Sequence, residues 1–581
     1  MMADEEKTAL WRSAAFDPLD RALGDLMARL DPSRPLVALA AALASRARGL
    51  GHVCWTLGVE PVLKVEGEEI QEYKLPSKLE WSAAFAGSKL VGRPGDYTPL
   101  ILDSEGRIYL HQLHATEGKL AVAIASRAAV PSTSFNASAL ETFLGSLIAG
   151  KSLKQKQREA VMVACDRPLT VLTGGPGTGK THAAVRLIAA GIRLGLVQPE
   201  RIRVAAPTGK AAARLQEKLE MELGDLVGDA ALAAAVPKAG TLHRLLGASA
   251  DGTRFSRDRE KPVEADWILV DEVSMVGMEM MSRLFEATIP AKKVILIGDP
   301  NQLESVEAGA VLAELVRAGD VGGVLAGGVV ALEENQRVEM GALGLLALAS
   351  MVNAGDGVEV SRSLAQSVWP EARLKSLREP KELSELISAT VEQFVRAKSA
   401  PTAEMALAEY GRSKVLCALR IGPTGSLQFN SLVEEKLRGE RIAGSHWFHG
   451  QPVIVTRNNY SLSLFNGDLG VVWRVGNELA VMFPGAGGEL RSVAVSRLPE
   501  YETAFALTVH KAQGSEFDRV DFLLPFEDSP VLSRELVYTA VSRARVGLKI
   551  WGSEEVLVGA VVRQSQRHSG FGTRLAASRG N

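Results

Sequence analysis

The chain has 581 residues, of which 46% are hydrophobic and 23% charged, and this composition excludes a disordered, collagenous or disulfide-scaffold protein. At about 150 residues per domain, the length predicts three or four domains. The net charge of −2 excludes nucleic-acid binding through an overall positive field, so a DNA site would have to be a local one.

Cysteine usage and hydropathy indicate a cytoplasmic protein. The three cysteines, Cys54, Cys165 and Cys417, are far apart and form neither a metal-ligand spacing nor an even disulfide set. The most apolar stretch, residues 35–44, has about half of the roughly 20 residues that a membrane span needs. The acidic N-terminus lacks the apolar segment of a signal peptide. We therefore expect no contact with a membrane.

The N-terminal region predicts a mixed α/β domain over residues 1–125. Asp17 and Pro18 are typical of a helix start. Leucines then follow at helical spacing, which predicts a face packed into the core, at Leu19, Leu23, Leu26 and Leu30. The domain shows no catalytic pattern. Small polar residues at 130–134 predict a linker over residues 126–149.

From about residue 150, short β-rich runs alternate with helical stretches, which predicts parallel sheets with crossover helices. The first set of runs is 169–173, 202–206, 267–270 and 294–297, and the second is 414–419, 519–524 and 548–551. They predict one α/β unit over 150–335 and another split between 336–449 and 501–581. Residues 450–500 contain short strands separated by Asn-Gly and Gly-rich turns, which predict a small antiparallel barrel inserted into the second unit.

A phosphate-binding loop is the strongest motif. It follows a β run and precedes a helical stretch, and it consists of Gly174, Gly175, Pro176, Gly177, Thr178, Gly179, Lys180 and Thr181. Backbone N–H groups of such a loop bind phosphate oxygens. Lys180 would reach the β and γ phosphates of ATP, and the Thr181 hydroxyl would be a ligand of Mg²⁺.

A phosphate loop needs a carboxylate on a neighbouring strand. The apolar run 267–270 ends in Asp271 and Glu272. We expect Asp271 to hold Mg²⁺ through water and Glu272 to act as the general base that activates the attacking water. A solvated strand end is the alternative for such a pair considered alone.

Two glutamines are further candidates. Gln302 closes the segment 298–302 (GDPNQ) after a third strand, where an amide could sense the γ-phosphate, although an ordinary turn is equally compatible with the sequence. Gln157 precedes the phosphate loop, where its amide could read the adenine edge, and a plain surface glutamine is the alternative.

These segments follow one another in the order of superfamily-one helicase motifs. The further segments of the series are 206–210 (APTGK), 241–243 (TLH), Arg337, 508–516 (TVHKAQGSE) and 538–545 (YTAVSRAR). The chain resembles the RecD family, the α subunits of bacterial RecBCD exonucleases, from about residue 150 to the C-terminus. The phrases SVEAGAVL, LFNGDLG, SRLPEYET and HKAQGSEF carry that likeness. The N-terminal phrases LAAALASRARGLGHVC and PLILDSEGRIYL are also similar to that family.

The resemblance implies roles for further residues. Arg337 and Arg543 are similar to arginines that reach across the cleft to the γ-phosphate, where a guanidinium stabilises the transferring phosphoryl group. Glu516 is similar to a nucleotide-contacting position. Positions that contact single-stranded DNA match Pro207, Thr208, Thr241, His243, Thr508, His510 and Lys511. Gln336 stands where many members carry an adenine-stacking aromatic residue, so nucleotide selectivity is expected to be looser.

The resemblance also implies a fold and a function. It implies two RecA-like motor domains with an SH3-like barrel insertion, using ATP and Mg²⁺ to move 5′ to 3′ along DNA. The partners that it implies are single-stranded DNA or DNA ends and RecB-like and RecC-like subunits. The nuclease centre is expected on the RecB subunit, because no nuclease pattern occurs here. The helix-hairpin-helix region typical of stand-alone RecD-like helicases is also absent from the sequence.

The sequence leaves three alternative functions open. The chain could be a stand-alone helicase, a DNA-binding subunit with a degenerate ATPase, or a phosphate-loop ATPase that acts on protein or small molecules. The C-terminal residues from 561 carry arginines and no acid, which predicts a flexible end, with DNA or partner contact as the alternative; the arginines are Arg563, Arg567, Arg574 and Arg579.

Overall fold

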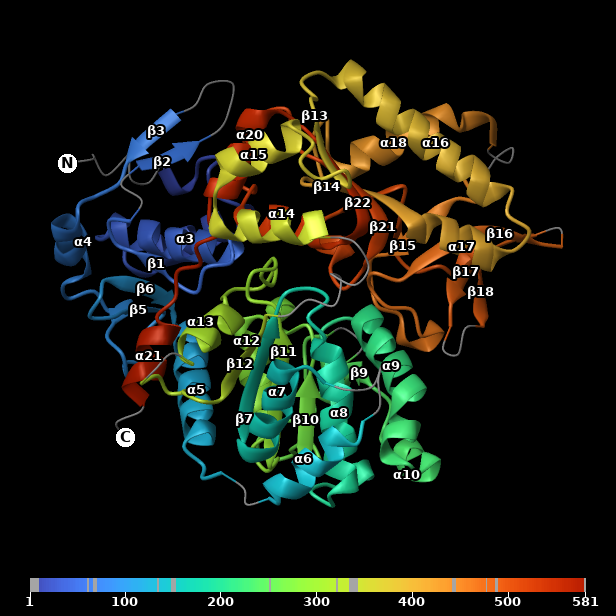
Figure 1. Ribbon diagram of the computed structural model, residues 1–581. Coiled ribbons are helices and arrows are strands. Elements are labelled where there is room, and N and C mark those ends of the chain that lie inside the picture. The colour runs from blue at the N-terminus through green and yellow to red at the C-terminus, as the bar shows by residue number, and fades with distance from the viewer. Residues whose placement is uncertain are drawn as a thin grey trace.

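The structure, a computed structural model, describes residues 10–59, 62–65, 71–132, 135–147, 153–249, 252–319, 322–333, 343–440, 446–476, 478–485 and 489–578. Two parallel sheets form the two main lobes, and the N-terminal region lies beside both of them (Figure 1). The last helix, α21 (Phe571–Ala577), returns to the N-terminal region and lies next to α5 (His111–Ala128). Within the described ranges, no helix is long and apolar enough to cross a membrane.

The first parallel sheet has six strands in the order β12-β7-β11-β10-β8-β9. Their bounds are β7 Leu169–Gly174, β8 Ile202–Ala206, β9 Gly240–Thr241, β10 Trp267–Val270, β11 Lys293–Gly298 and β12 Val329–Leu332. The central strands are buried on both faces, as expected for apolar runs in a parallel sheet. The helices of this lobe are α6 Ala137–Gly145, α7 Gln155–Asp166, α8 Lys180–Arg193, α9 Gly209–Val227, α10 Ala230–Ala234, α11 Leu242–Leu245, α12 Met278–Ala287 and α13 Val311–Arg317.

The second parallel sheet has five strands in the order β13-β22-β21-β14-β20. Their bounds are β13 Ala372–Lys375, β14 Ser413–Cys417, β20 Ala506–Thr508, β21 Phe517–Leu523 and β22 Ala544–Trp551. The accompanying helices are α14 Leu343–Ala354, α15 Gly357–Ala365, α16 Ser384–Lys398, α17 Ala403–Arg412, α18 Ser426–Lys436, α19 Arg534–Ser542 and α20 Glu554–Val562. The predicted α/β class with two parallel sheets is therefore confirmed.

Between β14 and β20, which are neighbours in the second parallel sheet, the chain forms a separate antiparallel sheet. Its order is β18-β17-β16-β15-β19, with β15 Pro452–Val455, β16 Leu469–Val475, β17 Glu478–Pro484, β18 Leu490–Ala494 and β19 Tyr501–Thr503. It has its own small core, which includes Val453, Val472, Val481 and Phe483. The predicted insertion is present at this place as five antiparallel strands, while its SH3-like closure stays a prediction.

The N-terminal region combines helices with a small mixed sheet of order β1-β6-β5-β4 and a hairpin. The strands are β1 Trp55–Thr56, β2 Val62–Val65, β3 Gln71–Lys74, β4 Val91–Gly92, β5 Leu100–Leu102 and β6 Arg107–Leu110, and the first helices are α2 Pro18–Leu30, α3 Pro35–Gly49 and α4 Lys78–Phe85. The predicted helix start at Asp17 and Pro18 is confirmed.

The leucine face predicted on α2 is wrong for three of its four members, whereas Leu23 packs against the core. Leu19, Leu26 and Leu30 are 69%, 41% and 58% exposed. The buried face of α2 instead contains Asp20 and Gly24: Gly24 lies against the Trp11 ring, and Asp20 accepts a hydrogen bond from Ser45 of α3. A small residue against Trp11 and a hydrogen-bonded residue against α3 occupy the buried face, and this leaves Leu19, Leu26 and Leu30 on the outside.

The predicted linker and flexible tail are both built into the fold. The limit at residue 125 falls within α5, which packs on the first parallel sheet, and α6 lies inside the segment 126–149. The C-terminal strap, defined here as residues 563–577, is also ordered, so the prediction of a flexible end is wrong. Phe571 and Leu575 are 0% and 1% exposed in the same core as α5. The amphipathic spacing of those two residues outweighs the surrounding arginines, whereas Arg579 lies outside the described residues.

Candidate functional site

The phosphate loop forms the expected turn between β7 and α8. Gly174, Gly177 and Gly179 have φ of 149°, 78° and 84°, and these left-handed values favour glycine. Lys180 begins α8, and its Nζ donates hydrogen bonds to the carbonyl oxygens of Gly174 at 2.5 Å and Gly175 at 2.9 Å. The ammonium group therefore lies in the mouth of the loop, at a helix N-terminus that suits phosphate.

Asp271 and Glu272 follow the central strand β10, beside the phosphate loop. The Thr181 hydroxyl donates to Asp271 Oδ2 at 3.4 Å, so the two predicted Mg²⁺ ligands are neighbours. Burial, and after it the charge of Glu272, raise the pKa of Asp271 to about 6. Glu272 has a left-handed φ of 54°, a strained backbone conformation of the kind that clusters at active sites.

These residues fit a magnesium–nucleotide complex. A hydroxyl and a buried carboxylate are oxygen ligands, and Mg²⁺ is usually held by one or two protein oxygens together with substrate phosphates.

The predicted sensor Gln302 joins the two lobes through Asp299. Gln302 Nε2 donates to Asp299 Oδ2 at 3.1 Å, and the Tyr538 hydroxyl of α19 donates to the same oxygen at 3.1 Å. Gln302 is buried, and its Oε1 has no hydrogen-bond partner in the described part of the chain. A Cβ at Gly175 would lie 3.0 Å from the Tyr538 hydroxyl, so this tyrosine also borders the phosphate loop.

Other hydrogen bonds cross between the same lobes. Leu303 N donates to Thr539 Oγ1 at 2.8 Å, and the Leu303 carbonyl accepts from Gln513 Nε2 at 2.9 Å. Lys210 Nζ donates to Ser515 Oγ at 2.7 Å. The segment after β11 is therefore held by α19 and by the loop that follows β20, and the segment after β8 is held by the same loop.

The two predicted arginine fingers have different outcomes. Arg543 is buried at the end of α19, and its guanidinium donates to the carbonyls of Ser515 at 3.2 Å and Thr539 at 3.3 Å. Its approach to a phosphate stays a prediction. Arg337 and Gln336 lie outside the described residues. Glu516 forms an ion pair of 3.0 Å with Arg214 of α9, so it also lies at the boundary between the lobes.

The predicted DNA-contact residues lie at strand ends on both lobes. Residues 206 and 241 are direct partners in the β8–β9 pair, which brings Pro207, Thr208, Thr241 and His243 together. The Thr208 and Thr241 hydroxyls cap α9 and α11. Burial lowers the pKa of His243 and of His510, so both imidazoles stay neutral near pH 7.

The second half of this set surrounds the end of β20. Thr508 Oγ1 accepts from Lys511 N at 3.3 Å, which shapes the turn that contains His510. Lys511 Nζ is paired with Glu502 at 2.6 Å, and Glu502 also binds Arg420 at 3.1 Å. A DNA phosphate at Lys511 would therefore compete with an existing carboxylate.

Gln157 serves the phosphate loop in this structure. It is buried, its Nε2 donates to the Thr178 carbonyl at 2.9 Å, and its Oε1 accepts from Lys154 N at 3.1 Å. Support of the loop is thus observed, while contact with adenine stays a prediction.

Comparison with known proteins decides the family. The chain is 38% identical over 559 residues to the RecBCD enzyme subunit RecD of Mycolicibacterium smegmatis, and the match covers 93% of each chain. The chain belongs to the RecD family. The RecD N-terminal domain matches residues 12–109, an AAA domain matches 157–308, and the UvrD-like helicase C-terminal domain matches 503–550. The predicted family, and with it the predicted class of ATP-dependent helicase, are confirmed.

Two other proteins that the chain resembles are named as helicases. The chain is 32% identical to the ATP-dependent RecD2 DNA helicase of Deinococcus radiodurans, over 80% of this chain and 57% of that protein. Among solved structures, Pif1 helicase from Bacteroides in complex with ADP-AlF3 and ssDNA is 15% identical, with a TM-score of 0.40, over 71% of this chain and 95% of that one.

Sequence reasoning missed several contacts of this RecD-family site. The motif segments 508–516 and 538–545 contain Gln513, Tyr538 and Thr539, but the sequence does not predict the bonds of these residues to the opposite lobe. Lys210 was likewise part of a motif without a role. Their position inside a motif is the one sequence feature that indicates a role for these residues. A single sequence does not tell which hydroxyl or amide faces the other lobe.

Proposed function

We propose that the protein is the ATP-driven, 5′ to 3′ DNA helicase subunit of a RecBCD-type helicase–nuclease. The observation that carries the proposal is the division of one nucleotide site between two lobes: the phosphate loop and Asp271 belong to the first, and Tyr538 of the second borders the loop at Gly175 and donates to Asp299. Hydrolysis at such a boundary changes the contact between the lobes, and lobe movement is what advances a strand.

The chain's residues divide the work of hydrolysis. The loop amides and Lys180 bind and orient the phosphates, Glu272 takes the proton of the attacking water, and Gln302 senses the γ-phosphate. Thr181 and Asp271 would hold Mg²⁺, which neutralises charge on the phosphates. Arg543 supplies positive charge from the second lobe, and the family likeness assigns the same chemical role to Arg337.

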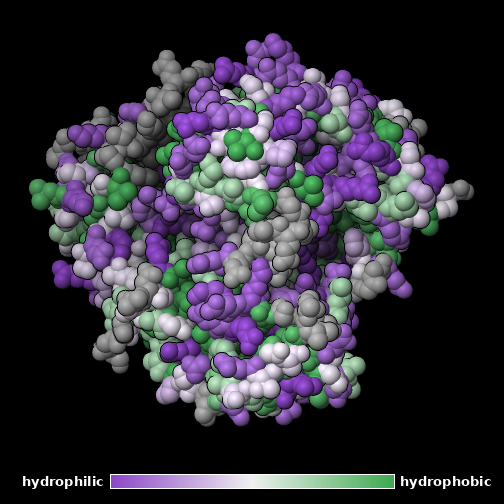
Figure 2. Space-filling view, viewed as in Figure 1, coloured by the Kyte–Doolittle hydropathy of each residue, from purple (hydrophilic) through white to green (hydrophobic). Residues whose placement is uncertain are grey.

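The seven DNA-contact residues lie at strand ends on both lobes, which supports a path for single-stranded DNA across them. Small hydroxyls and helix N-termini bind phosphates without reading base sequence. On the face in Figure 2, the surface is hollowed between the lobes, and hydrophilic side chains gather in this recess. Polarity rests on the family likeness.

We propose that residues 1–125 bind RecB-like and RecC-like partners in the cytoplasm. The exposed Leu19, Leu26 and Leu30 of α2 support this, because a row of exposed leucines suits a protein interface. We propose the remaining limits as a connecting segment at 126–149, motor domain 1 at 150–335, motor domain 2 at 336–449 and 501–581, and an SH3-like insertion at 450–500.

The test is unwinding of DNA duplexes with a single-stranded 5′ tail or 3′ tail. The chain is assayed alone and after co-expression with RecB and RecC homologues, in which the RecB phosphate loop is disabled. We expect ATPase that single-stranded DNA stimulates, and unwinding of the 5′-tailed duplex. Unwinding of only the 3′-tailed duplex would overturn the polarity, and ATPase that ignores DNA would overturn the function.

A further inference from the structure

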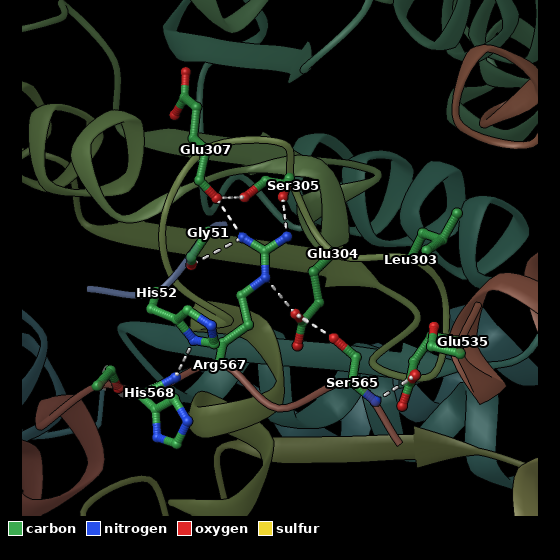
Figure 3. Close-up of polar contacts among 12 residues, drawn as sticks. Gly51, His52, Leu303, Glu304, Ser305, Glu307, Glu535, Ser565, Arg567 and His568 are labelled. Atoms are coloured by element: carbon green, nitrogen blue, oxygen red, sulfur yellow. Dashed lines mark hydrogen bonds and ion pairs between the residues drawn. The ribbon is translucent and has the colours of Figure 1, made fainter. Parts of the chain in front are cut away.

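The C-terminal strap contains an arginine that meets three parts of the chain at once. Arg567 follows α20 of the second lobe by five residues, and its side chain is only 14% exposed (Figure 3). Its Nε pairs with Glu304 Oε2 at 2.7 Å. Its two Nη atoms donate to the carbonyls of Ser305 at 2.6 Å, Glu307 at 2.6 Å and Gly51 at 3.1 Å.

Three of these partners belong to the loop that continues from the sensor. Gln302 and Glu304 are two residues apart, and Leu303 between them is fixed by Thr539 and Gln513 on the second lobe. Arg567 holds the other end of this loop, at 304–307. The loop is thereby fastened at both ends, and Gln302 lies at the end nearer to the phosphate loop.

The fourth partner links this loop to the N-terminal region. The Gly51 carbonyl accepts from both Arg567 Nη1 and Gly309 N, the latter at 2.9 Å. Gly51 has a φ of 87°, and a Cβ there would lie 2.4 Å from the Arg567 guanidinium, so no larger residue fits. Next to it, His568 N donates to His52 Nδ1 at 3.0 Å, and Val53 N donates to the His568 carbonyl at 2.8 Å.

The shape of the guanidinium suits this task. Arg567 uses three nitrogen atoms in one plane to reach a carboxylate and three carbonyls in different directions. A lysine would keep the ion pair with Glu304 but could not span the carbonyls with the same rigidity. The contacts therefore specify arginine, which a purely electrostatic anchor would not require.

We propose that Arg567 is a positioning residue for ATP hydrolysis, which fixes the loop behind Gln302 and ties it to the N-terminal region. The inference rests on the proposed function and deepens it. The arginine bonds Glu304, Ser305 and Glu307, and it acts through residues 303–307 on the alignment of Gln302 and Asp299 with the phosphate loop. Misplacement of a catalytic group by about 1 Å is sufficient to slow a reaction by about 100-fold.

The test compares Arg567→Ala, Arg567→Lys and Arg563→Ala in the full chain. Arg563 is the matched control, because it lies on the same strap but its side chain donates to Asp528, Ser529 and Leu532 of the second lobe. Each variant is measured for kcat and KM of ATPase with saturating single-stranded DNA and for its thermal unfolding midpoint.

We expect Arg567→Ala to lower kcat by about tenfold or more while KM for ATP stays within about twofold, because the phosphate loop is untouched. Arg567→Lys should recover part of kcat, and Arg563→Ala should keep it. Equal kcat in wild type and Arg567→Ala would overturn the inference, as would an equal loss in Arg563→Ala.

A second variant covers the case in which Arg567→Ala does not fold. Glu304→Gln keeps the side-chain shape but removes the charge that pairs with Arg567, so it should lower kcat in the same direction. Full kcat in both Glu304→Gln and Arg567→Lys would overturn this inference but would leave the proposed function standing. A wild-type chain whose ATPase ignores DNA would instead overturn the proposed function, and this inference with it.

Discussion

The Tyr538 hydroxyl donates a hydrogen bond of 3.1 Å to Asp299, although 239 positions separate the two residues. Burial, followed by the charge of Asp299, raises the pKa of Tyr538 well above its usual value, so the hydroxyl stays a donor. Asp299 also accepts from Gln302, so one carboxylate oxygen connects the second lobe to the predicted γ-phosphate sensor.

Tyr538→Phe removes only this hydroxyl. We expect ATP affinity to stay within about threefold and DNA-stimulated kcat to fall by about tenfold, because the sensor loses its contact with the other lobe. Steady-state ATPase combined with a nucleotide-binding titration measures both. Tyr410→Phe is the control, since its hydroxyl donates to the Gly450 carbonyl at the start of the insertion and not to the first lobe. An unchanged kcat for Tyr538→Phe would show that the contact is only structural.

Lys180→Gln should abolish DNA-stimulated ATPase. The ammonium group is the positive charge in the mouth of the phosphate loop, and glutamine does not supply it. The variant should unfold within a few degrees of wild type, since Lys180 is only half-buried at the start of α8. Substantial remaining ATPase in a folded variant would mean that another loop binds the nucleotide.

Glu272→Gln should bind ATP with Mg²⁺ but hydrolyse it at least about 100-fold more slowly. The amide has the same shape but does not accept the proton of water, and general bases contribute about 10²–10⁴-fold. The left-handed φ of 54° is no harder for glutamine than for glutamate, so the fold is retained. Single-turnover hydrolysis measures the chemical step, and a normal rate would place the base elsewhere.

The sequence predicted the strands well because each is a short apolar run between turn residues. The run 202–206 and the run 267–270 coincide with β8 and β10. The prediction failed where a neighbour decides: Leu19 repeats at helical spacing, yet the buried face of α2 carries Asp20, bonded to α3, and Gly24, packed against Trp11. The catalytic motifs could be predicted for a similar reason, because each is a local run of residues. The role of Arg567 could not be predicted, because it contacts residues more than 250 positions away.

Glu117 makes stability depend on pH. Burial raises its pKa from 4.5 to about 7, against the opposing charge of Arg574 at 2.7 Å, with Tyr109 and Glu314 nearby. The native state therefore binds more protons than the unfolded state between about pH 4.5 and 7, and stability falls as pH rises through this window, by about 3 kcal/mol for this group.

Glu117→Gln should remove that part of the pH dependence. Denaturant midpoints at pH 5 and pH 8 should differ less in this variant than in wild type. Glu141→Gln, at an exposed site on α6, is the control and should keep the wild-type difference. An identical pH dependence in wild type and Glu117→Gln would mean that Glu117 is ionised in the folded chain throughout this range.

Arg543→Ala should separate ATP binding from hydrolysis. Arg543 ends α19 four residues after Thr539, so its guanidinium lies on the helix that meets the sensor segment of the first lobe. In this structure it donates to the Ser515 carbonyl, and Ser515 itself accepts from Lys210 of the first lobe. We expect closure of the lobes to bring the same side chain to the phosphates, so that hydrolysis depends on closure.

The expected size of the effect distinguishes an arginine finger from an anchor. Loss of a finger should lower turnover by about 10³-fold or more with ATP affinity within a few-fold. Single-stranded DNA should still bind, because Thr208, His243 and Lys511 are unchanged. Arg545→Ala is the matched control, since Arg545 pairs with Asp518 at 2.6 Å two positions further along the chain. If Arg543→Ala hydrolyses ATP within tenfold of wild type, its bonds to Ser515 and Thr539 are its whole role, and the positive charge on the γ-phosphate must come from elsewhere.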